Sequence, residues 1–146
     1  MNAAAAINIL TVLAGVDKPV LKIVSSYQSG RKNVRFQAKY SPMRDSITIT
    51  QDLLADFTNE AELAFMLAHE LGHRALRHGY KFLLNRQKAE QEADAYAIRA
   101  MRRVGFDVTK VPWWFDRRIS SQQGTARRKM AVRKAAILNI IEGVST

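Results

Sequence analysis

The segment His69-Glu70-Leu71-Gly72-His73 constrains this chain more than any other, because it reads H-E-x-x-H within a stretch that has the apolar spacing of a helix. Two histidines four residues apart lie on one face of a helix, about one turn from each other, so both rings can reach one metal ion. The glutamate between them projects beside that ion, where its carboxylate can take a proton from bound water. The segment therefore predicts a helix that carries part of a metal site.

The helix around this motif has recognisable ends. Asn59 is the expected N-cap, and Glu62, three residues later, completes a capping box. Arg74, Arg77 and Gly79 are typical of a C-terminal end. The apolar face that would pack against a core consists of Leu63, Met66, Leu67, Leu71 and Ala75.

Three segments before this helix are rich in residues that favour strands, namely Val20–Tyr27, Asn33–Tyr40 and Ser46–Thr50. Turn residues at Ser29-Gly30 and Ser41-Pro42 separate them. We expect a small antiparallel sheet with one buried face, because the last two segments alternate apolar and polar residues. The prediction is a mainly helical α+β domain with this sheet beside the motif helix.

Two further helices are expected after the motif. One runs from about residue 85 to 104 and is closed by Gly105, and the other runs from about residue 126 to 142 and is closed by Gly143. Between them, Val111–Phe115 is an aromatic cluster that we expect to anchor the C-terminal segment on the core. The alternative is that one of its rings lines a substrate cleft.

The apolar segment Ala3–Val16 is expected to form an N-terminal helix that packs on the core. Its 14 residues are fewer than the roughly 20 that span a membrane. It also lacks the basic start of a secretory signal, since the first basic residue is Lys18. A signal or membrane anchor is the alternative, and the sequence favours a cytoplasmic protein over a secreted or membrane-associated one.

Length and charge set further limits. A chain of 146 residues fits one domain, residues 1–146, and the absence of cysteine excludes disulfides and thiolate ligands. The formal charge of +10 divides into +5 over residues 1–45, −2 over residues 46–100 and +7 over residues 101–146. An acidic middle suits a metal site. The basic C-terminal third is either a solvated surface, which we favour because no nucleic-acid motif accompanies it, or a surface for an anionic partner such as nucleic acid, lipid headgroups or an acidic protein.

A catalytic zinc site uses three protein ligands and keeps a fourth position for water, so the two histidines need a partner. His78 does not fit, because peptidases of the H-E-x-x-H-x-x-G-x-x-H type would need glycine at 76 and histidine at 79, where this chain has Leu76 and Gly79. We expect His78 to lie exposed at the helix end. Glu90 fits better, since the 17 residues that separate it from His73 accommodate a turn and the start of an antiparallel helix.

Glu90 and Asp94 share one face of that second helix, because they are four residues apart. The carboxylate of Glu90 can close the site, while Asp94 is placed to accept a hydrogen bond from the far ring nitrogen of a liganding histidine. Glu92 faces another side of the helix and is a weaker alternative. The plainer interpretation, an ordinary acidic helix surface, is disfavoured by the upstream motif.

Three motifs carry a family resemblance: Asn59–Ala64, Leu67–His73 and Glu90–Asp94. They resemble the zinc metallopeptidases related to the heat-shock protease HtpX and the CAAX prenyl endopeptidase, which are gluzincins with a helical H-E-x-x-H and a later E-x-x-A-D helix. The resemblance covers about residues 45–117. It implies a zincin-like fold and one Zn²⁺ ion, with the first glutamate of the later helix as the third ligand.

The chain departs from that family in two places. It lacks the transmembrane helices of the membrane-embedded members, so it resembles the soluble, minimal form. The histidine-proline-serine segment that precedes the last helix in many members is replaced by Ser120–Thr125. Arg127 and Arg128 are then the candidates for the arginine that usually follows, and for a second group that stabilises the oxyanion or contacts the substrate.

We therefore expect a zinc metalloendopeptidase in which His69, His73 and Glu90 hold the metal and Glu70 is the general base. An extended polypeptide substrate would add along an edge of the sheet, at the strand 46–50. One alternative is a regulatory peptidase of the ImmA/IrrE type that cuts a repressor, because its H-E-L-G-H and later acidic helix are similar. Another is a non-catalytic binding or assembly protein that keeps the metal structurally, although a structural site needs no base.

Overall fold

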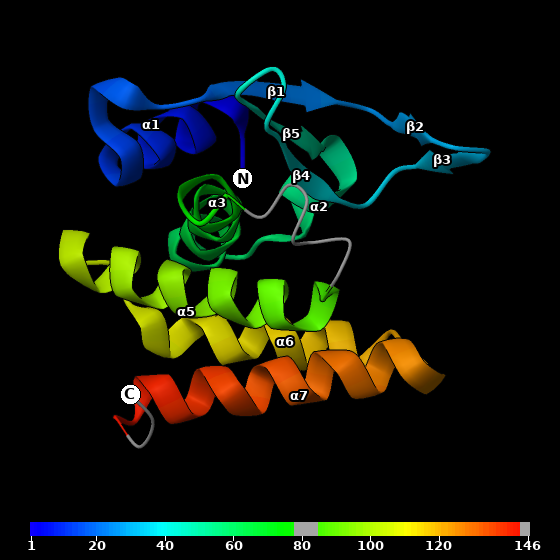
Figure 1. Ribbon diagram of the computed structural model, residues 1–146, viewed down its shortest axis with the longest axis vertical. Helices are drawn as coiled ribbons and strands as arrows, with labels where there is room; N and C mark the ends of the chain where they lie inside the picture. Colours follow the sequence, from blue (N-terminus) through cyan, green and yellow to red (C-terminus); the bar gives the residue numbers. More distant parts are fainter. Residues whose placement is uncertain (78–84, 144–146) are drawn as a thin grey trace.

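The structure is a computed structural model that describes residues 1–77 and 85–143. The motif lies on α3 (Glu60–Ala75), which occupies the middle of the molecule. Figure 1 shows α1 (Ala3–Ala14) and the strands on one side of α3, and α5 (Arg86–Val104) on the other side. There α6 (Val111–Ser120) and α7 (Gly124–Ile141) form a further layer. The chain has the expected α+β fold.

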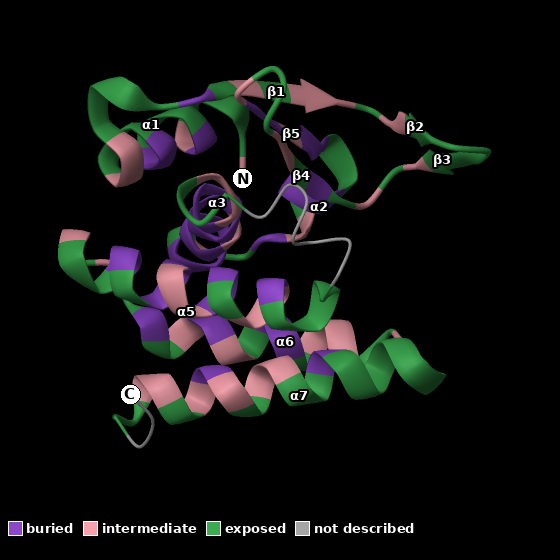
Figure 2. Cartoon of the chain, viewed as in Figure 1, coloured by how far each residue is buried: buried purple, intermediate pink, exposed green. Residues whose placement is uncertain are grey.

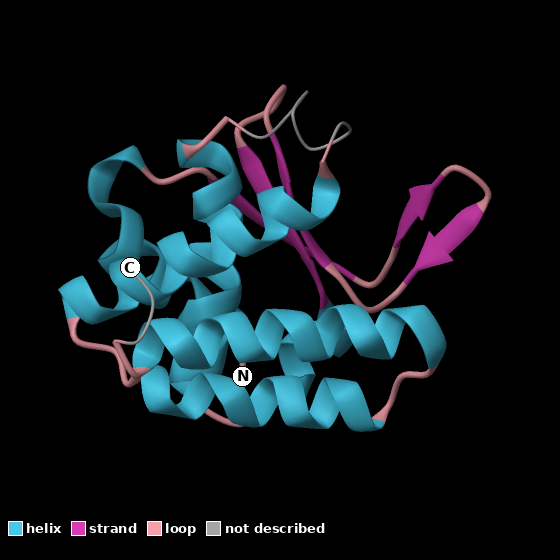
Figure 3. Cartoon of the chain, turned by 60° about the horizontal axis from the view of Figure 1, so that its bottom comes forward, coloured by secondary structure: helices cyan, strands magenta, loops and turns pink. Residues whose placement is uncertain are grey.

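The larger sheet has three strands in the order β1 (Val20–Val24), β5 (Ser46–Thr50) and β4 (Ala38–Ser41). β1 is parallel to β5, and β4 is antiparallel to it. Two short strands, β2 (Tyr27–Ser29) and β3 (Lys32–Val34), form a separate hairpin that projects from the body of the molecule (Figure 3).

The structure corrects the predicted sheet in three respects. The predicted strand Asn33–Tyr40 is divided between β3, which ends at Val34, and β4, which begins at Ala38. The predicted strand Val20–Tyr27 ends at Val24, and Tyr27 begins the hairpin instead. The hairpin and β4 lie between β1 and β5 in the sequence, and β5 pairs with β1 in the same direction. The sheet is therefore mixed rather than antiparallel. Because β5 is paired on both sides, the substrate edge that we placed at Ser46–Thr50 is wrong, and β4 is the sheet edge next to α3.

Helix α1 packs on the core, as its apolar sequence predicted. Ala6, Ile9 and Leu10 are buried, and the helix contacts α3. It ends at Gly15, whose φ of 66° lies in the left-handed region that glycine adopts easily, and a 3-10 turn, η1 (Gly15–Asp17), follows. Among the described residues, no helix is both long and apolar enough to cross a membrane.

The start of α3 follows the predicted cap with one difference. After α2 (Gln51–Asp56), the side chain of Asn59 accepts a hydrogen bond from the Glu62 backbone N–H, at 3.1 Å. The Glu62 carboxylate, however, accepts from the backbone N–H of Thr58, at 2.9 Å, and not from that of Asn59. It also pairs with Arg117 through two bonds of 2.7 and 2.9 Å, so the cap of α3 is tied to α6.

Helices α5 and α7 lie within two residues of the two bounds predicted after the motif, whereas α3 ends at Ala75, before Arg77, and the helix α6 was not predicted. The predictions for His78 and Gly79 fall outside the described residues. Helix α5 begins after an Asn85 cap and ends at Gly105, where φ is 90°. The remaining elements are η2 (Val108–Lys110), α6 (Val111–Ser120) and α7 (Gly124–Ile141).

The buried side chains are concentrated on α3 and on the faces that its neighbours turn toward it (Figure 2). The predicted aromatic cluster forms the first turns of α6. Trp114 and Phe115 are buried there, and Phe115 packs edge-on against Phe65 of α3 with ring centres 5.7 Å apart. Trp113 points outward and is 57% exposed. The cluster therefore joins the C-terminal segment to the core.

Candidate metal centre

Helices α3 and α5 are in close contact at Gly72. A Cβ atom placed on Gly72 would lie 3.0 Å from the Cα of Ala93, 3.1 Å from its carbonyl oxygen and 3.2 Å from the Cβ of Tyr96. Figure 1 looks along α3 while α5 runs across the view, so the two helices cross, and the expected antiparallel arrangement is wrong. The residue at position 72, just before His73, must therefore be very small.

This crossing brings Glu90 of α5 to the two motif histidines. The carboxylate oxygens of Glu90 lie 3.3 Å from His69 Nε2 and 3.1 Å from His73 Nε2. The two Nε2 atoms lie 3.1 Å from each other. Two imidazoles and one carboxylate thus converge on one point. The two histidines are one helical turn apart on α3, and Glu90 lies on the turn of α5 that faces them.

The three groups fit a tetrahedral Zn²⁺ ion. Zinc bonds to nitrogen and oxygen measure about 2.0–2.2 Å, which places neighbouring ligand atoms of a tetrahedron about 3.3–3.6 Å apart. The observed separations of 3.1, 3.1 and 3.3 Å are close to that spacing. Zinc commonly takes two histidines and a glutamate in hydrolases, with the fourth position left for water.

Asp94 orients His69 from the side away from this point. Its Oδ1 atom lies 2.7 Å from His69 Nδ1, and both side chains are buried. The carboxylate can only accept, so a ring proton lies on Nδ1, and Nε2 presents its lone pair to a metal once it has lost its own proton. Burial opposes a charge on His69, but the hydrogen bonds to Asp94 and Glu90 raise its pKa to about 10 in the metal-free protein.

Arg133 of α7 holds the two carboxylates of α5. Its guanidinium donates to Asp94 through Nε and Nη2, both at 2.8 Å, and Nη1 lies 3.5 Å from Glu90. The guanidinium also lies over the Phe115 ring, 5.2 Å from its centre. Burial opposes ionisation of Asp94, but Arg133 and His69 keep the pKa of its carboxyl below the ordinary value. Arg133 therefore fixes the acids that face the histidines.

Glu70 lies beside the metal position and is 5% exposed. One of its oxygens lies within 4.8 Å of the nearest nitrogens of His69 and His73. Burial raises the pKa of Glu70, while the two histidines and a hydrogen bond from the Tyr40 backbone lower it by less. A carboxylate whose pKa is raised is a stronger base, as proton abstraction from water requires.

Hydrogen bonds and ion pairs connect the edge strand β4 to α3. The hydroxyl of Tyr40 on β4 donates to Asp45 at 2.7 Å, and Arg74 near the end of α3 donates to the same carboxylate at 2.9 and 3.0 Å. Arg74 also donates to the backbone carbonyl of Asp17 at 2.6 Å. These bonds fix the distance between the β4 edge and Glu70.

A cleft runs across the site and has two halves, of about 400 and about 300 Å³. Both halves are lined by Gln37, Ala38, His69, Glu70 and Glu90, so the reacting groups lie where the halves meet. The hairpin and β4 form one wall of the first half, while α6 and α7 form a wall of the second. The first half is also lined by Tyr27, Ser29, Lys39, Tyr40, Pro42, His73 and Arg86, and the second by Phe36, Leu53, Met66, Trp114, Arg118, Gln122, Met130 and Arg133.

The arginines named from the sequence are not brought to the cleft. Arg127 and Arg128 are exposed on the first turns of α7, and Arg128 donates to Thr125. The arginine of this helix that reaches the site is Arg133, about one and a half turns later. Glu92, the weaker alternative to Glu90, is exposed on another face of α5.

Sequence reasoning missed Arg133, Gly72 and the Tyr40 backbone. Arg133 is 39 residues from Asp94 and lies in a run of basic residues, so no local pattern distinguishes it from Arg127 or Arg128. Gly72 had a usable signal, because a glycine inside a helix costs about 1 kcal/mol and is usually kept for close packing.

Residues 40–88, about a third of the chain, match the sequence profile of peptidase family M48. This segment includes the last two residues of the edge strand β4, the strand β5, the motif helix and the start of α5, and ends just before Glu90. The comparison with curated proteins gave no match. Over this segment the chain is similar to peptidase family M48, whose members are metallopeptidases that usually depend on zinc.

Proposed function

We propose that this chain is a zinc-dependent endopeptidase whose metal is held by His69, His73 and Glu90. The observation that carries the proposal is the convergence of these three groups at 3.1–3.3 Å, with a buried carboxylate, Glu70, beside them. Bound Zn²⁺ would supply Lewis-acid activation of water and polarisation of the scissile carbonyl.

The remaining chemistry belongs to the side chains. Glu70 takes a proton from the attacking water on its carboxylate and delivers it to the departing amine. Asp94 accepts from His69 Nδ1 and keeps that ring in one orientation through the reaction. Arg133 holds Asp94 and Glu90 in place by its hydrogen bonds and charge. A structural metal site has no need of a base such as Glu70, which argues against the non-catalytic alternative.

The edge strand is suited to align an extended substrate. Thr50 N–H donates to the Gln37 carbonyl at 3.0 Å, and Lys39 is opposite Thr48, so residues 37 and 39 turn their backbone groups toward β5. The backbone groups of Ala38 and Tyr40 then face the open edge. There the backbone N–H of Tyr40 donates a hydrogen bond to the Glu70 carboxylate. A peptide that pairs with this edge would pass across the metal position.

Metal analysis and proteolysis of an unfolded protein test the proposal. Purified wild type should contain one zinc per chain and cleave the substrate, whereas Glu90→Ala should lose the metal. Glu70→Gln should keep the metal and lose at least about 10³-fold in turnover, because the base is removed. Glu92→Gln, an acid-to-amide change on another face of α5, is the matched control. A Glu70→Gln protein that cleaves as fast as wild type would show that the assigned role of Glu70 is wrong.

A further inference from the structure

The walls of the cleft are positively charged on both sides of the reacting groups. Lys39 and Arg86 line the first half, and Arg118 and Arg133 line the second. Among the described residues, the only acids that line either half are Glu70 and Glu90. Glu70 and Glu90 act on the proton and the metal, and Arg133 is paired with Asp94 and Glu90, so the charges considered for a substrate are those of the cations on the walls, Lys39 and Arg118.

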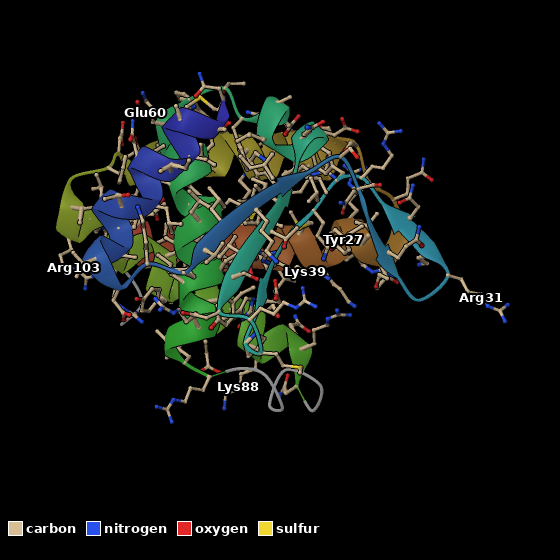
Figure 4. All side chains as sticks on the ribbon, turned by 90° about the horizontal axis from the view of Figure 1, so that it is seen from above. Tyr27, Arg31, Lys39, Glu60, Lys88 and Arg103 are labelled. Atoms are coloured by element: carbon tan, nitrogen blue, oxygen red, sulfur yellow. The ribbon has the colours of Figure 1, made fainter. Side chains whose placement is uncertain are left out.

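Lys39 is held at the wall of the first half by an aromatic ring. Its ammonium lies 4.0 Å from the centre of the Tyr27 ring, and Figure 4 shows the two side chains next to each other where the hairpin leaves the sheet. The Tyr27 hydroxyl donates to Gln37 at 2.5 Å, which keeps the ring in place. In the part of the chain that the structure describes, Lys39 has no carboxylate within ion-pair distance.

Arg118 is held in the same manner at the wall of the second half. Its guanidinium lies 4.2 Å from the centre of the Phe36 ring, which lines the same half. The neighbouring Arg117 pairs with Glu62, whereas Arg118 has no carboxylate partner within residues 1–77 and 85–143. Lys39 and Arg118 thus each pack on an aromatic ring rather than pair with a carboxylate, so both can form an ion pair with an acidic ligand.

These contacts favour a polypeptide ligand over a nucleic acid. Proteins that bind single strands use open aromatic faces on which bases stack, together with a continuous run of cations along the backbone. Here a cation already covers one face each of Tyr27 and Phe36, and Glu70 and Glu90 interrupt the cationic walls where the halves meet. An extended peptide along β4 would instead place single side chains near Lys39 and near Arg118.

We propose that the cleft selects polypeptides that carry an aspartate or glutamate on each side of the scissile bond, one recognised by Lys39 and the other by Arg118. This inference rests on the proposed peptidase function and adds the class of substrate. Ion pairs at partly exposed sites are modest, so each cation should contribute about three- to tenfold in kcat/KM, mainly through KM.

The experiment uses fluorogenic peptides of one sequence with glutamate, glutamine or lysine at the positions that flank the scissile bond. Zinc-loaded wild type should prefer glutamate over glutamine on either side and discriminate most against lysine. Lys39→Gln should abolish the preference on one side only, and Arg118→Gln should abolish it on the other. Lys22→Gln and Arg99→Gln, exposed cations outside the cleft, are the matched controls and should leave both preferences unchanged.

A binding measurement separates this inference from the proposed function. The Glu70→Gln protein, loaded with zinc, should bind the glutamate peptide more tightly than the glutamine peptide by the same factor, and 0.5 M NaCl should remove the difference. If wild type cleaves no peptide but this binding preference is present, the peptidase proposal fails and the cleft assignment stands. Equal binding and equal cleavage of all three peptides would overturn the assignment. A single-stranded oligonucleotide that displaces the glutamate peptide at lower concentration than an acidic competitor peptide would overturn it too.

Discussion

Gly72→Ala tests whether the spacing of α3 and α5 sets the metal site. In an ordinary helix this substitution stabilises the protein by about 1 kcal/mol, because alanine is the better helix former. Here the new Cβ would lie 3.0 Å from the Ala93 Cα, whereas carbon atoms pack at about 3.5–4.0 Å. The opposing atom belongs to the backbone and cannot rotate away, so α5 must move by about 0.5 Å or more.

The shift affects metal binding more than folding. Overpacking of this kind costs about 1–3 kcal/mol, so the net loss of unfolding free energy should be about 0–2 kcal/mol once the helix gain is included. Metal bonds tolerate only about ±0.2 Å, so moving Glu90 with α5 should weaken zinc binding by about 10–100-fold.

Zinc affinity is measured by competition with a coloured chelator, and stability by urea unfolding with chelator and with zinc. Gln87→Ala, at an exposed position of α5, controls for changes in that helix. If Gly72→Ala were about 1 kcal/mol more stable than wild type and bound zinc equally well, the close contact at the helix crossing would have no role in the site.

Three further predictions concern Arg133, Glu62 and the sheet edge. Arg133→Met should lower the unfolding free energy of the chelated protein by about 3–5 kcal/mol, because it removes one of the two buried positive charges beside Asp94 and leaves the three acids of the site in excess. The loss should be smaller when zinc is bound, and equal losses in the two states would contradict the charge argument. Burial raises the pKa of Glu62, but its bonds with Arg117 and Thr58 lower the pKa by more, so the net shift is downward. The contribution of Glu62 to the stability of the fold is therefore complete above about pH 4.5 and is lost as the pH falls through the lower folded pKa. Arg117→Gln should therefore move the acid-unfolding midpoint, followed by circular dichroism, to higher pH, and an unchanged midpoint would count against the pair. A substrate N-methylated at the amide that pairs with Ala38 should be cleaved about tenfold more slowly, which is the worth of one hydrogen bond, while methylation one residue away should have little effect; equal rates would exclude pairing at β4.

The parts of the site that follow from sequence are those with a local signal. The four-residue spacing of His69 and His73, the Asn59 cap and the glycine after Val104 each depend on one helix, and the structure has them where the pattern placed them. Glu90 needed a second helix, and it was identified from its spacing to Asp94 and from the family resemblance. The way the two helices meet was not predictable in this manner, because the crossing depends on atoms of Gly72 and Ala93 that no periodicity records.

The remaining differences are all non-local. Pairing of β1 with β5 depends on how the intervening hairpin returns the chain, so the strand residues alone did not distinguish a mixed sheet from an antiparallel one. Arg133 lies on a helix of basic residues, and only the packing of α7 against α5 decides which of them reaches Asp94. The basic third of the chain is evident from the sequence, but the fold determines that Arg133, and not Arg127 or Arg128, pairs with Asp94.

The charges at this centre connect these findings. Glu70, Glu90 and Asp94 bring three negative charges and Arg133 returns one, which leaves an excess equal in size to the charge of one divalent cation. Without a metal, protons offset this excess: burial opposes a proton on His69, yet Asp94 and Glu90 raise the pKa of His69 to about 10, and burial raises the pKa of Glu70. The His69 contribution to stability is therefore complete below about pH 6.5 and is lost as the pH rises through about 10. Zinc must displace these protons, so its binding at pH 7 should release at least about one proton per ion, as calorimetry in buffers of different ionisation enthalpy would measure. Binding without proton release would mean that His69 is already neutral and that the buried acids of α5 do not hold its charge.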